Sequence, residues 1–313
     1  MNVYPLAFGL ASYLANSGRK KGSLSTSGAL GAWVVGYFTM ANDLHLFGAL
    51  MIVFYLLGSK ATKYKSLVKA QLESGHPSSS TPSAGHRTFF QVVSNSFSGT
   101  IVAIFWRIFY GTDGVRHGGD FLDLKNSCPV VSTSELDRWS KVFVYAAIGH
   151  FACCLGDTLA SELGILSKSR PRLVTTFRPV PPGTNGGVSL FGLTVSLLGG
   201  LIISSTSVLV LLAESPACRG EPGMADWVRE VMTAGMAAGL GGSLLDSLLG
   251  ATVQRTVYSA KDRKVLTTEP AQADWEDQAL VVVAGWNLLT NSQINLLTSM
   301  VCALACGYVA YLS

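Results

Sequence analysis

The chain has 313 residues, of which 49% are apolar and 13% are charged, and a soluble domain carries about twice that charged fraction. The net charge is only +4, and no long basic or acidic tail is present, which excludes disordered, fibrous and nucleic-acid-binding proteins. With 33 glycines and several long apolar stretches, the composition is typical of a polytopic membrane protein. We therefore expect an all-α fold that forms one integral membrane domain over residues 1–313.

The apolar stretches predict about seven to nine membrane helices. The first, 3–14, follows no basic leader, cleavage site or transit peptide, so we interpret it as a membrane helix. The two short stretches on either side of Asn42 and Asp43 are either half-helices, one bent span or two crossings. The segment 75–85, rich in serine and proline, is predicted to be a mobile linker. The remaining stretches are 28–41, 44–58, 90–106, 139–165, 186–213, 227–253 and 279–312, the last of which divides into two helices near Asn291 in one interpretation.

Basic residues are distributed unevenly among the loops. If both short stretches cross the membrane, the loops 16–27, 59–88, 166–185 and 254–278 lie on one side and hold 16 of the 23 lysines and arginines. The opposite loops, 107–138 and 214–226, carry five basic and eight acidic residues. The positive-inside rule therefore places the first set in the cytoplasm.

The six cysteines fall mostly inside apolar stretches and show no metal-ligand spacing. We interpret them as small buried residues and do not expect a disulfide.

Two similar segments place carboxylates inside apolar stretches. They are GDTLASELG at 156–164 and GSLLDSLLG at 242–250, and their shared spacing of glycine and serine indicates a possible internal repeat. Close packing of helices explains the glycines alone. A buried aspartate costs about 2.5 to 3.5 kcal/mol in a membrane helix, so packing does not explain the acids. We predict that Asp157, Glu162 and Asp246 are catalytic residues and ligands of Mg²⁺, and a proton or sodium relay in a transporter is the alternative.

The loop PVPPGTNGGVS at 179–189 joins a basic segment to an apolar stretch. Its glycines allow the backbone to approach an anion, and the helix that follows offers an N-terminus that favours negative charge. An ordinary turn is the alternative explanation. The candidate residues for binding nucleotide or phosphate are Lys21, Arg178, Gly183, Thr184, Asn185, Gly186 and Gly187.

Two sets of polar residues recur every four positions, which places each set on one face of a helix. They are Arg87, Gln91 and Asn95, and Asn287, Asn291 and Asn295. Hydrogen bonding between helices explains such stripes. The alternative is a substrate-lining role, for which Asn95, Asn287 and Asn291 are the candidates.

Four motifs in this order resemble those of the integral membrane family that contains transmembrane protein 19 and chloroplast phytyl-phosphate kinase. They are KKGSLSTSGA, GDTLASELG, PPGTNGGVSLFG and GSLLDSLLGA, and the resemblance spans nearly the whole chain. Family members often have tryptophan where this chain has Leu159. The GD-x-x-AS element is also similar to one in polyprenol and dolichol kinases.

This resemblance implies a kinase that uses CTP or ATP and Mg²⁺ to phosphorylate an isoprenoid monophosphate at the cytoplasmic membrane face. The expected partners are membrane lipids and the prenyl phosphate, whose tail would stay in the bilayer. We expect an endomembrane rather than a plastid location because no transit peptide is recognisable. The alternative function is a transporter of an anionic metabolite or lipid that uses the same carboxylates.

Overall fold

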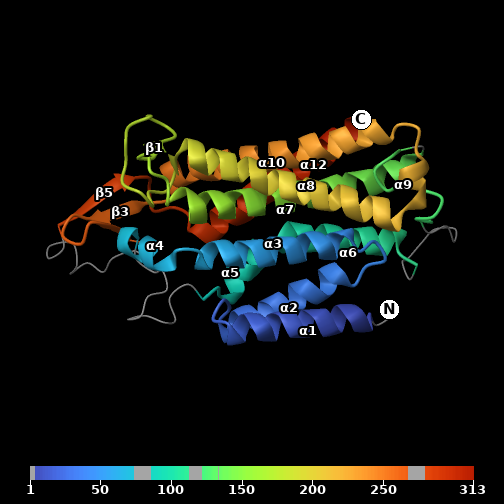
Figure 1. Ribbon diagram of the computed structural model, residues 1–313, viewed down its shortest axis with the longest axis horizontal. Coiled ribbons are helices and arrows are strands. Elements are labelled where there is room, and N and C mark those ends of the chain that lie inside the picture. Colours follow the sequence, from blue (N-terminus) through green and yellow to red (C-terminus); the bar gives the residue numbers. More distant parts are fainter. Residues whose placement is uncertain (1–3, 74–85, 113–121, 133, 267–278) are drawn as a thin grey trace.

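The structure is a computed structural model that describes residues 4–73, 86–112, 122–132, 134–266 and 279–313. Long helices lie side by side along the long axis of the molecule, and loops and short strands join them at its two ends (Figure 1). Within the described residues, five helices are long and apolar enough to cross a membrane, which confirms a helical membrane protein. They are α3 (Leu46–Lys63), α7 (Glu135–Gly164), α8 (Leu190–Glu214), α10 (Met224–Val253) and α12 (Asn291–Leu312).

Three further helices are shorter, so the number of spans judged by length is lower than predicted. α1 (Pro5–Lys20), α2 (Thr26–Met40) and α6 (Phe97–Tyr110) have 16, 15 and 14 residues, or about 21 to 24 Å of helix. The hydrocarbon core of a bilayer is about 30 Å thick. α2 and α3 nevertheless run in opposite directions as separate helices (Figure 1). The Asn42 side chain stabilises the turn between them by donating to the Ala103 carbonyl at 2.8 Å.

The stretch predicted as one helix over 90–106 is broken. α5 (Phe89–Ser94) ends at Asn95, and α6 begins at Phe97 after a turn. The break leaves the Asn95 carbonyl available to a neighbouring helix, and the Cys154 thiol donates to it at 3.5 Å. Discontinuous helices of this kind place polar backbone inside a membrane domain where it lines a site.

The prediction of helix throughout 279–312 is wrong at its start. β5 (Leu280–Ala284) pairs with β3 (Thr256–Ser259), which also pairs with β4 (Lys264–Leu266). The three valines of β5 favour a strand because they are β-branched. α12 begins only at Asn291, after a capping box between Thr290 and Gln293. Asn287 therefore lies outside the helix and does not share a helical face with Asn291 and Asn295.

The other short elements lie at the two ends of the helices. α4 (Ser66–Leu72) follows α3, and α9 (Pro216–Gly220) follows α8. β1 (Arg172–Leu173) pairs with β2 (Gly187–Val188) in the connection from α7 to α8.

Glycines bring α7, α8 and α10 into close contact. A Cβ atom on Gly156 of α7 would lie 2.5 Å from the Gly239 carbonyl oxygen of α10. A Cβ atom on Gly239 would in turn lie 2.8 Å from the Gly200 Cα atom of α8. These distances leave no room for a side chain, so they support helix packing as the role of the glycines.

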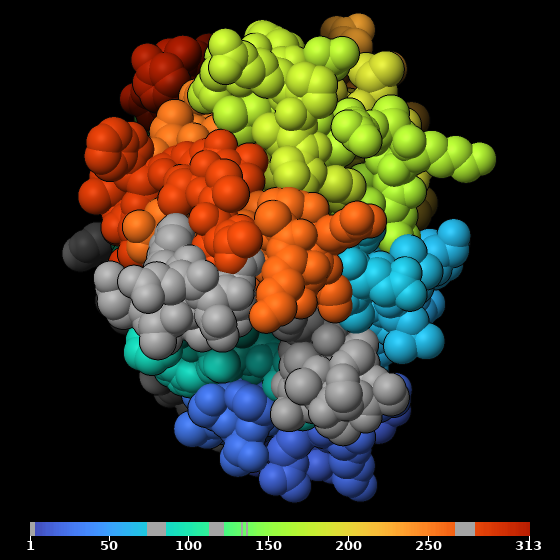
Figure 2. Space-filling view, turned by 90° about the vertical axis from the view of Figure 1, so that its left-hand side faces the viewer, coloured from blue at the N-terminus to red at the C-terminus, as the bar shows by residue number. Residues whose placement is uncertain are grey.

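The loops rich in lysine and arginine gather at one end of the molecule. The α1–α2 turn, α4, the β1–β2 connection and the strands β3 to β5 all lie at this end (Figure 1), and Figure 2 shows their surface. We call it the basic end. The charge asymmetry read from the sequence is therefore an asymmetry of the folded molecule, which the positive-inside rule would orient toward the cytoplasm. The predicted mobile linker at 75–85 lies outside the described residues.

The expectation that no disulfide forms is wrong. Cys128 and Cys218 are bonded to each other. Both are buried, as predicted, but they lie outside the apolar stretches, in the two acidic loops. Disulfides persist in oxidising compartments, so this bond supports a non-cytoplasmic location for the end opposite the basic end. The other four cysteines are free and at least partly buried, as predicted.

Candidate functional site

Asp157 and Asp246 lie at equal depth in two neighbouring helices. α7 and α10 each have 30 residues and run toward the basic end (Figure 1). Each aspartate precedes the last residue of its helix by seven positions, which is about 10 Å along the helix axis. The two carboxylates are close enough for their charges to interact. We call Asp157 and Asp246 the carboxylate pair.

Neutral polar groups surround the carboxylate pair. The Thr298 hydroxyl donates to Asp246 Oδ2 at 3.4 Å, and the Asn295 amide nitrogen lies 3.2 Å from the same atom in its better-satisfied orientation. The other amide atom of Asn295 faces the Asn95 side chain at 2.9 Å, at the break between α5 and α6. Among the described residues, neither aspartate forms an ion pair with a cation. Two carboxylates with neutral partners have the donor chemistry that suits a hard cation.

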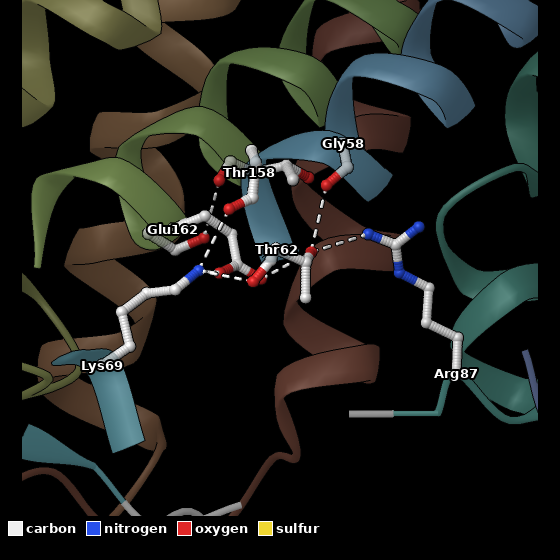
Figure 3. Close-up of polar contacts among 8 residues, drawn as sticks. Gly58, Thr62, Lys69, Arg87, Thr158 and Glu162 are labelled. Carbon is white, nitrogen blue, oxygen red and sulfur yellow. Dashed lines mark hydrogen bonds and ion pairs between the residues drawn. The ribbon is translucent and has the colours of Figure 1, made fainter. Parts of the chain in front are cut away.

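Glu162 belongs to a different group of residues, shown in Figure 3. Its carboxylate accepts from Lys69 Nζ at 2.6 Å and from the Thr62 hydroxyl at 2.8 Å. Arg87 approaches the same Thr62 hydroxyl at 3.3 Å. We call Thr62, Lys69, Arg87 and Glu162 the basic cluster, because it contains two cations and one anion.

Lys69 is held firmly in this cluster. Its side chain is fully buried, and Nζ also donates to the carbonyls of Ala61 and Thr62 at 3.0 and 2.7 Å. The part of the chain that the structure describes contains no group of three His, Cys, Asp or Glu side chains that could hold a metal. Asp157, Glu162 and Asp246 therefore do not form a three-carboxylate site here, and Glu162 is occupied by Lys69.

Arg87 connects the other residues of the basic cluster to the turn between α1 and α2, because its side chain bonds to Thr62 and its backbone bonds to Ser23 and Ser25. Burial lowers the pKa of its guanidinium, and the nearby Glu162 and Tyr55 partly offset this effect by raising it. A lowered pKa of this kind is typical of a buried cation whose lost hydration is not fully replaced by contacts with acceptors or negative charges. The stripe of Arg87, Gln91 and Asn95 indicated this position from the sequence. Nothing in the sequence distinguished Lys69 from the other lysines of its loop.

The predicted phosphate loop packs on the end of α10. Gly183 and Gly186 have φ angles of +87° and +75°, which favour glycine. A Cβ atom on Gly186 would also lie 2.5 Å from the Ser247 carbonyl oxygen. The N–H groups of Asn185 and Gly187 already donate within the protein, to Thr256 Oγ1 at 3.1 Å and to the Thr184 carbonyl at 2.9 Å. Packing and turn geometry thus account for these residues, and their role in phosphate binding stays a prediction.

The remaining candidates are exposed and separate from the carboxylate pair. Lys21 lies in the α1–α2 turn, and Arg178 lies in the β1–β2 connection on the other side of the basic end (Figure 1). Asn287 and Asn291 are exposed around the start of α12. Of the predicted substrate-lining residues, Asn95 is connected to the carboxylate pair by its side chain, through Asn295, whose amide nitrogen also lies 2.9 Å from the Asn291 backbone carbonyl.

Comparison with known proteins gives the family. Residues 9–303 match the integral membrane protein family DUF92. The chain belongs to this family. Both the carboxylate pair and the basic cluster lie within the part of the chain that matches DUF92.

Among DUF92 relatives, Protein PGR of Arabidopsis thaliana is 31% identical over 308 residues, which cover 96% of this chain and 95% of that protein. An uncharacterized membrane protein of Methanocaldococcus jannaschii is 36% identical over 116 residues, covering 36% of this chain and 42% of the relative. Protein VTE6, chloroplastic, of Arabidopsis thaliana is 26% identical over 182 residues, or 58% of this chain and 46% of that protein. No solved structure matches the chain.

Proposed function

We propose that this protein is a membrane kinase that transfers a phosphoryl group from CTP or ATP to an isoprenoid monophosphate at the cytoplasmic face. One observation carries the proposal: two carboxylates that form no ion pair among the described residues lie on α7 and α10, and a cluster with excess positive charge surrounds Glu162, five residues beyond Asp157 in α7. The motif resemblance to the family of chloroplast phytyl-phosphate kinase supports a lipid phosphate as the acceptor.

The reaction joins two anions, so positioning and charge neutralisation would supply most of the catalysis. Asp157 and Asp246 would hold Mg²⁺, which binds one or two carboxylates together with phosphates and water. When bound, the ion would neutralise charge on the transferred group. The acceptor phosphate is already ionised near neutral pH, with a second pKa of about 6, so no strong general base is required. Glu162 would position Lys69.

The triphosphate would bind at the basic end. In the loop 183–187, the N–H groups of Gly183 and Gly186 would contribute, because those of Thr184, Asn185 and Gly187 already donate within the protein. Lys21 and Arg178 would attract the phosphates from the surface. Thr184 would act through the loop, since its hydroxyl donates to the Pro181 carbonyl at 2.7 Å and so stabilises the turn.

A transporter of an anionic solute is the second candidate, and the break between α5 and α6 favours it. Transporters commonly place such breaks beside coupling-ion sites near intramembrane carboxylates, and Asn95 at this break is linked to Asp246 through Asn295.

The two functions separate in detergent, where no gradient can form. Purified protein is assayed with Mg²⁺, labelled triphosphate and prenyl phosphates of several lengths, and compared with Asp157→Asn. The variant keeps the side-chain size but removes one charge, so turnover should fall about 100-fold, equivalent to about 2.7 kcal/mol of barrier. Asp226→Asn is the matched control, because Asp226 is exposed at the opposite end of α10 and forms its ion pair with the exposed Arg229. It should retain full activity.

The kinase proposal fails if the wild type shows no phosphoryl transfer with any of these substrates. The transporter is then favoured if sealed vesicles containing the wild type move an anionic solute and vesicles containing Asp157→Asn do not.

A further inference from the structure

A cavity lies between the N-terminal helices and the rest of the molecule. It contains about 730 Å³ of empty space when the open solvent at its mouth is included. Residues from α1, α2, α3, α5 and α7 line it. Along α2 the lining runs from Ala32 to Met40 at the end of the helix, a length of about 12 Å, and Leu24, just before α2, is also part of it.

Polar and apolar groups are segregated in this cavity. Apolar side chains such as Leu14, Val35 and Phe54 form the wall along α1, α2 and α3. Arg87, Gln91 and Asn95, which lie in α5 or directly beside it, contribute polar groups to the lining. A long apolar channel with a cation at one end matches a lipid that has a single hydrocarbon chain and an anionic head.

The backbone of Arg87 is fixed by the first of the four motifs. Its N–H donates to the Ser23 carbonyl at 3.2 Å, and its carbonyl accepts from the Ser25 N–H at 3.1 Å and from the Ser25 hydroxyl at 3.2 Å. Gly28 leaves space for this carbonyl, because a Cβ atom there would overlap it. The serines and glycine of KKGSLSTSGA therefore position Arg87 at the mouth of the cavity.

The guanidinium of Arg87 is incompletely paired. It donates to Thr62 Oγ1 at 3.3 Å and to Ser59 Oγ at 3.5 Å, and no ion pair within 4.0 Å joins it to a described carboxylate. Glu162 is taken by Lys69 and Thr62. A guanidinium has more donors than these two contacts use, and a buried charge is costly unless it is paired. A phosphate would supply the missing acceptors, since its oxygens match the planar fork of arginine.

We propose that this cavity is the acceptor site, in which an isoprenoid monophosphate places its phosphate on Arg87 and its tail between α1, α2 and α3. The tail would then lie inside the protein rather than in the surrounding bilayer. The identity of the lipid rests on the proposed function.

The cavity also lies beside the carboxylate pair. Thr158, which lines it, follows Asp157 in α7, and Asn95 in its wall reaches Asp246 through Asn295. Arg87 bonds to Thr62, which also bonds to Glu162, five residues beyond Asp157 in α7. A phosphate on Arg87 would therefore lie about 8 Å along α7 from the level of Asp157.

Two independent variants test the site by binding of labelled geranylgeranyl phosphate to the purified, full-length protein in detergent. Arg87→Gln should weaken binding about tenfold or more, the scale of a lost charge-assisted hydrogen bond, and should leave the weak binding of uncharged geranylgeraniol unchanged. Arg87→Lys should recover part of the affinity. Size-exclusion chromatography checks that each variant is folded.

Ala32→Phe tests the channel, because Ala32 lines the cavity on α2. The added ring should exclude long tails and shift the preference toward geranyl phosphate. Ala29→Phe makes the same change on the same helix at a residue that is not part of the cavity lining, and should keep the preference for the long tail. A purely structural role of Ala32 would not change the order of tail lengths.

The outcomes separate this inference from the kinase proposal. If phosphoryl transfer occurs but neither Arg87→Gln nor Ala32→Phe changes affinity or tail preference, the acceptor site lies elsewhere and the kinase proposal stands. If binding depends on both residues but no transfer occurs, the site stands and the kinase proposal fails. If phosphatidic acid competes with geranylgeranyl phosphate on equal terms, the occupant is an ordinary membrane phospholipid and the inference is overturned.

Discussion

The carboxylate pair and the basic cluster each contain one residue of α7, but they differ in the sign of their charge. Asp157 and Asp246 bring two carboxyl groups together, and the hydrogen-bonding partners of Asp246 among the described residues, Thr298 and Asn295, are neutral. The basic cluster holds two cations around Glu162, and the ion pair with Lys69 leaves Arg87 in excess. Each region thus has incomplete charge balance, with opposite sign. A metal ion and a phosphate would complete them together.

The comparison also separates structural from functional charge. The Lys69–Glu162 pair is closed, because Lys69 is fully buried and uses three acceptors. Removing one partner leaves the other charge buried without a counterion, so the substitution should lower stability more than activity. The carboxylate pair forms no ion pair of this kind among the described residues. Substituting one of its aspartates should therefore lower activity more than stability.

Lys69→Met should produce the largest loss of stability. The variant leaves Glu162 without its cation, which should lower the free energy of unfolding by about 3 to 5 kcal/mol. Titration with denaturing detergent, followed by circular dichroism, measures the change. Lys168→Met is the control, because Lys168 is exposed, and its effect should stay below about 0.5 kcal/mol. Equal stability of the two variants would show that the buried pair is not structural.

Asp246→Asn should show the opposite behaviour. Activity should fall about 100-fold, or about 2.7 kcal/mol of barrier, while stability does not decrease, because the variant removes repulsion from Asp157 and keeps the contact with Thr298. The kinase assay and the same unfolding titration give both values. A variant that loses stability but keeps full activity would make Asp246 a structural residue.

Gly239→Ala should produce the smallest of the three changes, a loss of stability at the contact between α10 and α8. Its new methyl group would meet backbone atoms of α8 at 2.8 to 2.9 Å, so overpacking should cost about 1 to 3 kcal/mol and displace α10 with Asp246. Gly241→Ala is the matched control, since nothing lies within 4 Å of its added atom, and better helix propensity should leave it at least as stable. If both variants behave alike in the unfolding titration, the glycine contact does not position the carboxylate.

The sequence predicted the parts of the site that depend on local properties. Hydropathy identified the helical stretches, and an acid inside an apolar stretch identified Asp157 and Asp246 without knowledge of their neighbours. Helical spacing grouped Arg87, Gln91 and Asn95, and all three line the same cavity, although α5 contains only Gln91. The same spacing failed for Asn287, because a capping box starts α12 after it.

By itself the sequence determined a helical membrane protein, the distribution of charge between its ends, and two acids at matching depth, because hydropathy, charge and rise per residue are properties of each segment alone. Only the tertiary structure decided that Glu162 pairs with Lys69, that Cys128 bonds Cys218, that a break at Asn95 faces the acids, and that Arg87 ends an apolar cavity. Each of these joins residues far apart in the chain. Their contacts depend on which helices become neighbours, and that follows from packing between helices rather than from any one of them.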